Sequence, residues 1–434
     1  MDGETIAETR PARREPMRSR YFGLLRANRN FRRVWLAQLI SEIGDWFYSL
    51  AVYDLLLQLT GSSEAVSWAI ILQTLPWFLM TPLAGPIVDR FPRRRLMILA
   101  DIVRGFVVLG LILVRTRSEV WLIYILLGAE VLFASVFEPA RNALLPDVCS
   151  AEEILPANAL SSLTWSTALA VGAALGGMVT ALAGRDFSFV ANSLSFFASA
   201  VLLAGVHVRE SHVARSRHRT GPHAGAFSSL REGIRYLRQD LKVLVLATAK
   251  TGIGVLGGSL LLLAVFGEKI FALPGRGALA MGWLYTARGM GAGTGPLIGD
   301  VLTRGESSRL WKSISLSYFI TGLGYIALAR APDLWLALVP IAVAHMASSN
   351  VWVVSTTLLH LNAAEDFRGR VFALDSGLVM LGVAASNYVL GVSLDAWKIE
   401  PRHLATLFGC ALMVPGLLWL PAQARWGRAP TARS

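Results

Sequence analysis

Acidic, basic and amide side chains interrupt several long apolar runs of this sequence, and these are the residue types that could carry chemistry. Glu42 and Asp45 are three positions apart, so a helix places both carboxylates on one face. A charge at the centre of a bilayer costs about 2.5 kcal/mol or more, which makes each such residue a candidate for a function. Six residues are candidates for binding a substrate or exchanging a proton: Glu42, Asp45, Glu130, Lys250, His345 and Asn350.

Asp101 and Arg104 form a further candidate, an intramembrane pair with the same three-residue spacing and opposite charges. The alternative is that the two charges serve only to neutralise each other within one helix. His345 also has an alternative, since a single histidine can bridge two helices instead of taking part in proton coupling.

Membrane-spanning helices are the elements that must position these residues. The chain of 434 residues is 54% hydrophobic and 16% charged, whereas soluble domains carry about 25% charged residues. Apolar runs of about 20 residues indicate transmembrane helices. We expect an all-α membrane protein of twelve transmembrane helices, centred near Trp46, Phe78, Phe106, Glu130, Leu169, Phe197, Gly254, Gly289, Thr321, His345, Val383 and Ala411.

The motifs of common enzyme classes are missing from the sequence. It contains no H-E-x-x-H, no G-x-S-x-G and no complete P-loop. Its two cysteines, Cys149 and Cys410, provide neither a disulfide framework nor metal-ligand spacing. We therefore expect no enzyme, no catalytic residues, no cofactor and no metal site.

One stretch, from Lys242 to Gly258, formally matches the dinucleotide-binding pattern G-x-G-x-x-G at Gly252–Gly257. That motif requires a strand, a turn and a soluble helix. Here the apolar run continues to Phe266 without a turn residue, so a membrane helix is the better interpretation. Helical spacing places five residues on one small-residue packing face: Lys250, Gly254, Gly257, Gly258 and Leu261.

Lys250 is expected to face a transport cavity because it shares that packing face. Its role would be to hold an acidic group of the substrate, or to neutralise Asp45 or Glu130. The alternative is that its side chain snorkels to the membrane interface. Lys250 lies about 12 Å deeper than Lys242 at 1.5 Å per residue, which is a long reach.

The basic residues concentrate in alternate loops. The net charge is +12, and 30 of the 41 Lys and Arg residues lie in the N-terminus, the C-terminus and five alternate connecting segments. By the positive-inside rule both termini are cytoplasmic and the protein lies in the inner or plasma membrane. Aromatic residues do not interleave with these arginines, so we expect no nucleic-acid partner. No apolar segment precedes the first span, so we expect no cleavable signal peptide.

The chain divides into two halves. We expect a basic cytoplasmic N-terminus at 1–33, a six-helix bundle at 34–207, a cytoplasmic linker with an amphipathic helix at 208–240, a second six-helix bundle at 241–424 and a tail at 425–434. The halves repeat faintly at an offset of 210 residues, where Gly85-Pro86 matches Gly295-Pro296 and Gly172 matches Gly382. Such a duplication is typical of secondary transporters.

The segment from Gly85 to Arg95 resembles the G-x-x-x-D-R-x-G-R-R-R signature of the major facilitator superfamily. It lies between the second and third spans, as in that family, although Pro92 replaces the second glycine. The resemblance implies a conformational motif in which Asp89 meets the positive N-terminal dipole of the eleventh span. The alternative is a solvated turn. The motif residues are Gly85, Asp89, Arg90, Arg93 and Arg94.

A second resemblance is to the exporter group that includes siderophore and macrolide efflux permeases. It depends mainly on the first half, with matches such as Phe31–Trp35, Glu138–Pro146 and Ala157–Leu160. Gly172–Gly177 lacks the proline of the drug-antiporter motif, and the fourth span has Glu130 where proton-coupled drug antiporters have an arginine motif. In the superfamily, spans one, four, seven and ten line the central cavity, and all six candidate residues lie on those spans.

We therefore expect a monomeric secondary active transporter that exports an amphipathic small molecule of the drug, antibiotic or siderophore type and couples export to protons. Its partners would be the substrate, protons and the lipid bilayer. The alternatives are an importer or lipid flippase of the same fold, and a membrane receptor or scaffold that has lost transport. Fold alone does not fix function.

Overall fold

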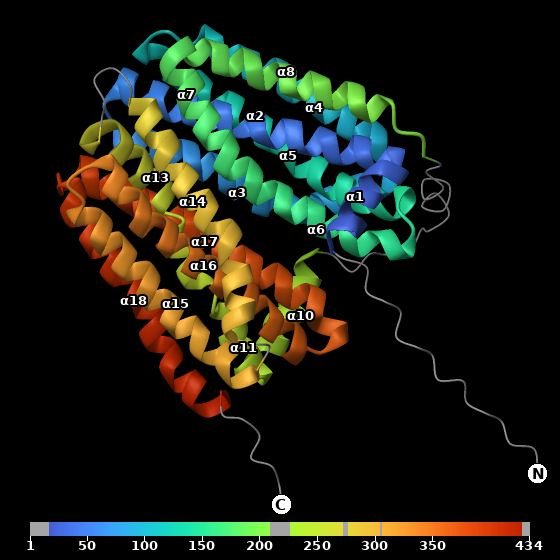
Figure 1. Cartoon of the computed structure of the whole chain (residues 1–434), viewed down its shortest axis with the longest axis vertical. Helices are drawn as coiled ribbons and strands as arrows, with labels where there is room; N and C mark the ends of the chain where they lie inside the picture. Colours follow the sequence, from blue (N-terminus) through green and yellow to red (C-terminus); the bar gives the residue numbers. More distant parts are fainter. Residues whose placement is uncertain (1–16, 209–225, 272–276, 304–305, 428–434) are drawn as a thin grey trace, which may run out of the picture.

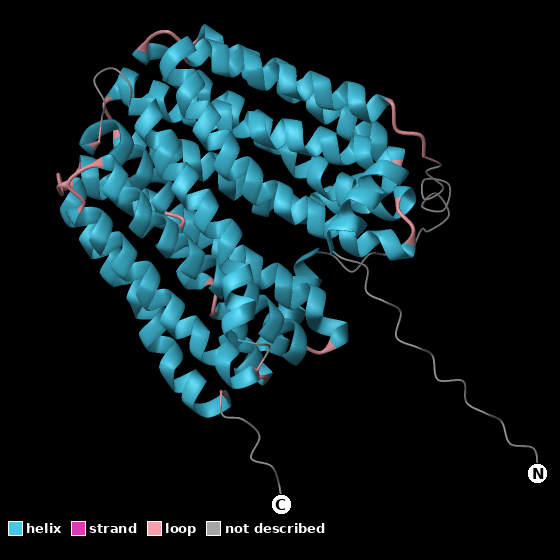
Figure 2. Cartoon of the chain, in the orientation of Figure 1, coloured by secondary structure: helices cyan, strands magenta, loops and turns pink. Residues whose placement is uncertain are grey.

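The computed structural model describes residues 17–208, 226–271, 277–303 and 306–427. The linker residues 209–225 and both ends of the chain lie outside the described residues. Some helical residues are described by their backbone only, and Gly85 and Asp89 are among them. The described residues form helices joined by turns and short loops, without any strand (Figure 2).

Twelve long helical segments follow one another along the described chain. Each predicted span centre lies in its own segment, so this prediction is confirmed. The segments are α2 (Arg29–Thr60), α3 (Ser63–Arg90), α4 (Arg93–Gly110), α5 (Val120–Val148), α6 (Ala151–Thr167) continued as α7 (Ala173–Ala183), α8 (Arg185–Ala204), α11 (Leu241–Thr248) continued as α12 (Thr251–Leu256) and α13 (Ser259–Val265), α14 (Gly277–Thr303), α15 (Ser307–Arg330), α16 (Leu334–Asn362), α17 (Glu365–Asp395) and α18 (Pro401–Trp426).

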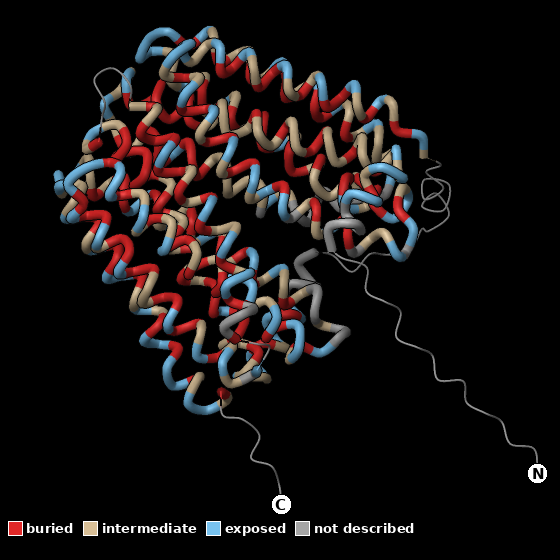
Figure 3. Tube along the Cα trace, viewed as in Figure 1, coloured by how far each residue is buried: buried red, intermediate tan, exposed pale blue. Residues whose placement is uncertain are grey.

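The chain is a multi-pass membrane protein. Eight of the segments are long and apolar enough to cross a bilayer by length and composition alone. α2 is less apolar because it contains Glu42, Asp45 and Asp54. Large apolar side chains such as Phe106, Val201 and Leu418 are exposed on the outside of the helices, where a soluble protein would place polar groups and a membrane protein meets lipid (Figure 3).

The helices form two bundles, α2–α8 and α11–α18, that converge at one end and diverge toward the other (Figure 1). At the convergent end α3 packs along α17, and α14 packs along α7. Small residues allow this close approach, because a Cβ on Gly177 would lie 2.7 Å from the Cα of Gly282. Asp395 at the end of α17 accepts a 2.6 Å hydrogen bond from Ser62, at the start of α3.

The internal repeat is visible in the packing of equivalent glycines. Gly172 lies against α2, where a Cβ would meet the carbonyl oxygen of Ile43 at 3.1 Å. Gly382 lies against α12, where a Cβ would meet the Cα of Gly254 at 2.9 Å. The fifth span therefore packs on the first as the eleventh packs on the seventh, and both contacts need a residue without a side chain.

The segments outside the two bundles differ from the expected boundaries. A short helix, α1 (Met17–Ala27), precedes the first span, which begins at Arg29, so helix extends into the stretch 1–33 that was predicted as a basic N-terminus. The predicted amphipathic helix is present as α10 (Ala226–Gln239), and it lies on α17. Tyr236 stacks on Phe367 with ring centroids 4.6 Å apart, and its hydroxyl accepts a hydrogen bond from the backbone N–H of Ala364.

Candidate functional site

A cavity of about 710 Å³ opens between the helices of the first bundle. Its lining extends along α2 from Gln38 to Tyr53 and along α5 from Glu130 to Asn142. The second bundle contributes Leu260 to its lining. The lining side chains on which the site depends are Gln38, Glu42, Asp45, Arg104, Glu130, Glu138 and Arg141, together with the aromatic residues Trp46, Tyr48, Tyr53, Trp77, Phe137 and Trp165.

Helical periodicity brings these groups together. Gln38, Glu42 and Asp45 are at positions i, i+4 and i+7 of α2, so they form one polar stripe. Opposite them, Glu130 and Glu138 occupy one face of α5 at i and i+8. The polar stripes of α2 and α5 line the same cavity, so they face each other across it.

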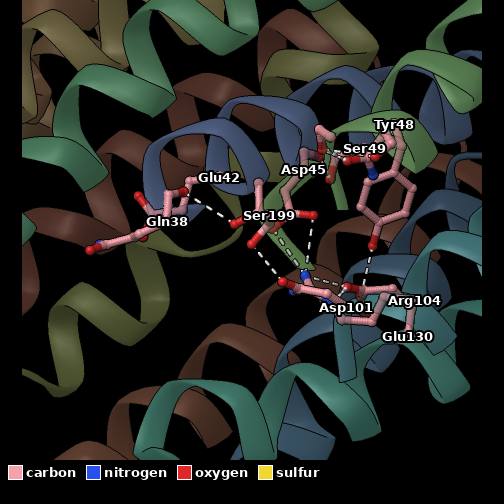
Figure 4. A network of polar contacts seen from close by, with 12 residues as sticks. Gln38, Glu42, Asp45, Tyr48, Ser49, Asp101, Arg104, Glu130 and Ser199 are labelled. Atoms are coloured by element: carbon pink, nitrogen blue, oxygen red, sulfur yellow. Dashed lines mark hydrogen bonds and ion pairs between the residues drawn. The ribbon is translucent and has the colours of Figure 1, made fainter. Parts of the chain in front are cut away.

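Arg104 on α4 is the centre of a buried ion cluster, and we call it with its carboxylate partners the Arg104 cluster. Its Nη2 lies 2.6 Å from Glu130 Oε1 and 3.1 Å from Asp45 Oδ2 (Figure 4). Tyr48 donates a 3.0 Å hydrogen bond to the other oxygen of Glu130. The guanidinium also lies 4.1 Å from the centre of the Phe196 ring. Planar forked donors suit such a position, because they bond two carboxylates at once.

Asp101 is a peripheral member of this cluster. Its Oδ1 is 3.8 Å from Arg104 Nη1, and its Oδ2 accepts a 2.5 Å hydrogen bond from Ser199 on α8. The pair of Asp101 and Arg104 inferred from the sequence is therefore in contact. The shorter bonds of Arg104, however, go to other helices.

A second charged group, which we call the Arg141 cluster, lines the same cavity nearer the divergent end. Arg141 Nη2 is 2.7 Å from Glu138 Oε2, and its Nη1 is 3.8 Å from Glu42 Oε1. Gln38 donates a 2.7 Å hydrogen bond to that same oxygen of Glu42. The other oxygen, Glu42 Oε2, is buried and has no hydrogen-bond partner among the described residues. The cluster therefore has acceptor capacity that the protein does not fill.

Lys250 lies in the second bundle and does not line the 710 Å³ cavity. Its Nζ is 2.5 Å from Asp375 Oδ2 on α17, and both side chains are almost inaccessible. The ammonium also lies 5.0 Å from the ring centre of Trp352. Lys250 thus pairs with Asp375 and not with Asp45 or Glu130, and its side chain is buried inside the second bundle. It occupies the junction where α11 ends and α12 begins.

His345 and Asn350 on α16 also lie away from that cavity. The Nε2 of His345 is 2.9 Å from the hydroxyl of Tyr325, and Asn350 donates a 3.0 Å hydrogen bond to Ser317. Both partners are on α15, and both side chains are buried. Each residue therefore bridges two helices of the second bundle in this conformation.

The basic residues after α3 bind to neighbouring helix ends. Arg93 donates to the carbonyl of Ala143 and pairs with Asp147 at 2.8 Å on α5. Arg94 donates to the carbonyl of Leu203 at the end of α8. These bonds join the start of α4 to the ends of α5 and α8, while Arg90 is exposed. Gly85 and the Asp89 side chain, the remaining motif residues, lie outside the described side chains.

Sequence reasoning missed several of these residues as site candidates. Glu138 and Arg141 are placed seven or more positions from Glu130 on one face of α5, and that spacing was a readable signal. Asp375 had a weaker signal, since it is a lone acid inside an apolar run. Its partner is 125 positions away, and helix periodicity says nothing about such pairs.

The comparisons with known proteins agree with this architecture. A model of the Major Facilitator Superfamily matches residues 34–386. An uncharacterized transporter of this type from Bacillus subtilis is 28% identical over 418 residues, which are 92% of this chain and 94% of the relative. The multidrug efflux pump Tap of Mycobacterium tuberculosis is 25% identical over 92% of this chain and 95% of its own length. The enterobactin exporter EntS of Escherichia coli is 25% identical over 92% of each chain.

Solved structures share the fold. A POT family peptide transporter in an auto-inhibited form aligns with a TM-score of 0.71 at 11% identity, over 94% of this chain and 98% of its own. A bacterial homologue of the iron transporter ferroportin in an inward-facing state aligns with a TM-score of 0.64 at 19% identity, over 92% of this chain and 99% of its own. At these identities the likeness concerns the fold alone.

Proposed function

The chain belongs to the major facilitator superfamily of membrane transporters, and we propose that it is a proton-coupled exporter of an amphipathic small molecule. One observation carries the proposal. A cavity large enough for a drug-sized molecule lies inside a transmembrane bundle, and carboxylates and aromatic rings form its walls. Buried carboxylates in an apolar span are costly, so their presence needs a function.

We infer the direction of transport from the charge pattern and from the divergence of the two bundles. The divergent end carries the start of α1, the end of α18 and basic connections between helices, which the positive-inside rule assigns to the cytoplasm. We propose that the cavity opens toward this end and takes up its substrate from the cytoplasm. Closing the divergent end and opening the convergent end would release the substrate outside the cell. This is transport by alternating access, and we assign it to a monomer in the inner or plasma membrane.

Proton coupling is assigned to Asp45 and Glu130, which share the guanidinium of Arg104. Protonating either carboxylate removes a negative charge from the Arg104 cluster, so the guanidinium shifts toward the other one. The protonated and the ionised cavity then bind a substrate differently, and a ligand shifts the equilibrium between conformations only by such a difference. Proton entry would in this way drive substrate release.

The names of two relatives, a multidrug efflux pump and an enterobactin exporter, support export. The other candidate cavity residues are Lys250, His345 and Asn350 of the second bundle. We propose that they approach the substrate when the two bundles close at the divergent end. Asp89 and the arginines after α3 are assigned to stabilising one of the two conformations.

The test is the intracellular accumulation of a library of amphipathic compounds in cells with and without the protein. The proposal predicts lower accumulation of at least one compound in expressing cells, and loss of this difference when an uncoupler collapses the proton gradient. A variant at an exposed acid, Glu306→Gln, serves as a control that retains export. If expressing cells accumulate more of a compound, or if the difference survives the uncoupler, export or proton coupling is rejected.

A further inference from the structure

The charge balance of the cavity is unequal. Two guanidinium groups, of Arg104 and Arg141, face five carboxylates in the two clusters: Glu42, Asp45, Asp101, Glu130 and Glu138. A membrane-embedded site with this excess of acids needs a proton or a cation, because unpaired buried charge is expensive. The described residues supply no third basic group to the lining of the cavity.

Three of the five carboxylates, those of Glu42, Asp45 and Glu138, are more exposed than either guanidinium, whereas Asp101 and Glu130 are as buried as Arg104. The side chains of Asp45 and Glu138 are 32% and 26% exposed, while those of Arg104 and Arg141 are 6% and 11% exposed. The arginines lie behind the acids and hold them in place. A molecule that enters the cavity therefore meets carboxylate oxygens before it meets a guanidinium.

Glu42 carries an acceptor atom without a partner: its side chain is 18% exposed, but one of its two oxygens is buried. Its Oε1 accepts from Gln38, but Oε2 is buried and has no hydrogen-bond partner in the described structure. The nearest basic atom, Arg141 Nη1, stands 3.8 Å from Oε1 and has no hydrogen bond of its own. A buried acceptor without a partner costs free energy, which a bound donor or cation removes.

Aromatic rings line the rest of the cavity, among them Trp46, Trp77, Phe137 and Trp165. The faces of such rings attract cations, tryptophan most strongly, and their bodies accept apolar surface. Acids and tryptophans that line one cavity therefore favour a ligand that carries a positive charge on a bulky apolar body.

We propose that the cavity binds a hydrophobic organic cation, with its charge beside Glu42 and Glu138 and its apolar body against the tryptophans. The inference rests on the proposed transport function and names its substrate class. A cation and protons compete for the same carboxylates, so a proton that enters the site displaces the cation. An anion of similar size would meet exposed carboxylates and no exposed basic group, so the cavity excludes it.

The experiment measures binding of radiolabelled tetraphenylphosphonium to the full chain in lipid nanodiscs. Tetraphenylborate, an anion of nearly the same shape, is the competitor that separates charge from hydrophobicity. Glu42→Gln and Glu138→Gln remove the two charges assigned to the ligand, and Glu306→Gln removes an exposed acid outside the cavity. Size-exclusion profiles establish that each variant is folded. Because Glu138 is the more exposed of the two, its variant keeps the test valid if Glu42→Gln does not fold.

We expect saturable binding of tetraphenylphosphonium that weakens at least about tenfold in the Glu138→Gln and Glu42→Gln variants and that falls as the pH is lowered. Ethidium should compete, whereas tetraphenylborate and Glu306→Gln should have no effect. Absence of binding, equal competition by tetraphenylborate, or unchanged affinity in both cavity variants overturns the inference.

Binding and transport measurements on the same protein distinguish a failure of this inference from a failure of the proposed function. If a neutral or anionic compound is exported while tetraphenylphosphonium does not bind, the inference fails and the transport function stands. If tetraphenylphosphonium binds as expected but no compound is moved under a proton gradient, the inference on binding stands and the transport function fails.

Discussion

Arg104 joins three helices, because its backbone lies in α4 while its guanidinium bonds Asp45 on α2 and Glu130 on α5. The sequence predicted each of these charged residues as a candidate, since a charge in an apolar run is a readable anomaly. It paired Arg104 with Asp101 from their spacing, yet the shorter bonds run between helices. The three-residue rule describes neighbours on one helix surface, and a long arginine reaches beyond it.

Lys250 is a second case in which spacing along one helix did not predict a contact between helices. The sequence indicated a lysine on a packing face, and Lys250 is indeed buried, but its partner Asp375 could not be read from any local pattern. Its distance from the described cavity also depends on the arrangement of the two bundles. Single-sequence periodicity locates a residue on a helix face, and tertiary packing decides what that face meets.

The ion pair of Lys250 and Asp375 predicts how single and double variants change the stability of the protein. Lys250→Met should destabilise the protein by about 3 to 5 kcal/mol, because it leaves the Asp375 carboxylate buried without its counter-charge. The double variant Lys250→Met with Asp375→Asn should regain most of that loss, since no uncompensated charge remains. The measurement is the thermal unfolding midpoint of the detergent-solubilised protein. Equal stability of Lys250→Met and wild type, or a double variant less stable than both single variants, would show that the two charges do not depend on each other.

At the scale of the elements, glycines decide how closely helices approach. The sequence placed Gly254 on a packing face, and the structure identifies its neighbour as α17. A Cβ on Gly254 would lie 2.7 Å from the carbonyl oxygen of Val379, so a larger residue must push α12 and α17 apart. Gly128 on α5 offers a matched control, because a Cβ there meets nothing within 4 Å.

Gly254→Ala should therefore destabilise the protein by about 1 to 3 kcal/mol, the usual cost of overpacking. Gly128→Ala should be neutral or slightly stabilising, since alanine is the better helix former. Both are measured as unfolding midpoints of the purified protein under the same conditions. A Gly254→Ala protein as stable as Gly128→Ala would mean that α12 and α17 are not in contact at this position.

The sequence did not predict which helix α10 packs against. Its amphipathic spacing predicted a helix with one apolar face, and the structure shows what lies against that helix: Tyr236 stacks on Phe367, and Leu237 is buried. An apolar stripe does not say whether lipid or protein covers it. By contrast, twelve long apolar runs are compatible only with membrane-spanning helices, so the number and order of these helices could be predicted.

At the scale of the whole molecule, the account depends on which end faces the cytoplasm. In a cysteine-free background, Ser216→Cys in the linker should resist a membrane-impermeant thiol reagent applied to intact cells, because the basic linker is assigned to the cytoplasm. Glu119→Cys, in the connection before α5, should react. Labelling of Ser216→Cys from outside would invert the topology and with it the proposed direction of transport.

The relation between the two bundles is the other property of the whole molecule that the sequence indicated only faintly. An offset of 210 residues suggested duplication, and the equivalent contacts of Gly172 and Gly382 give it a physical reason. The convergence of the bundles at one end could not be predicted, because it belongs to one conformation of the cycle and not to the sequence pattern.

In the proposed mechanism, proton entry at Asp45 and Glu130 drives the substrate out against its gradient. Its most direct measurement is transport in proteoliposomes with an imposed pH gradient, using a compound found in the accumulation screen. We predict concentrative uptake into acidic-lumen vesicles that contain inverted protein, abolished by an uncoupler and lost in the variant with both Asp45→Asn and Glu130→Gln, while downhill exchange persists. Concentrative transport of equal extent in that double variant, at equal protein content, would contradict the account.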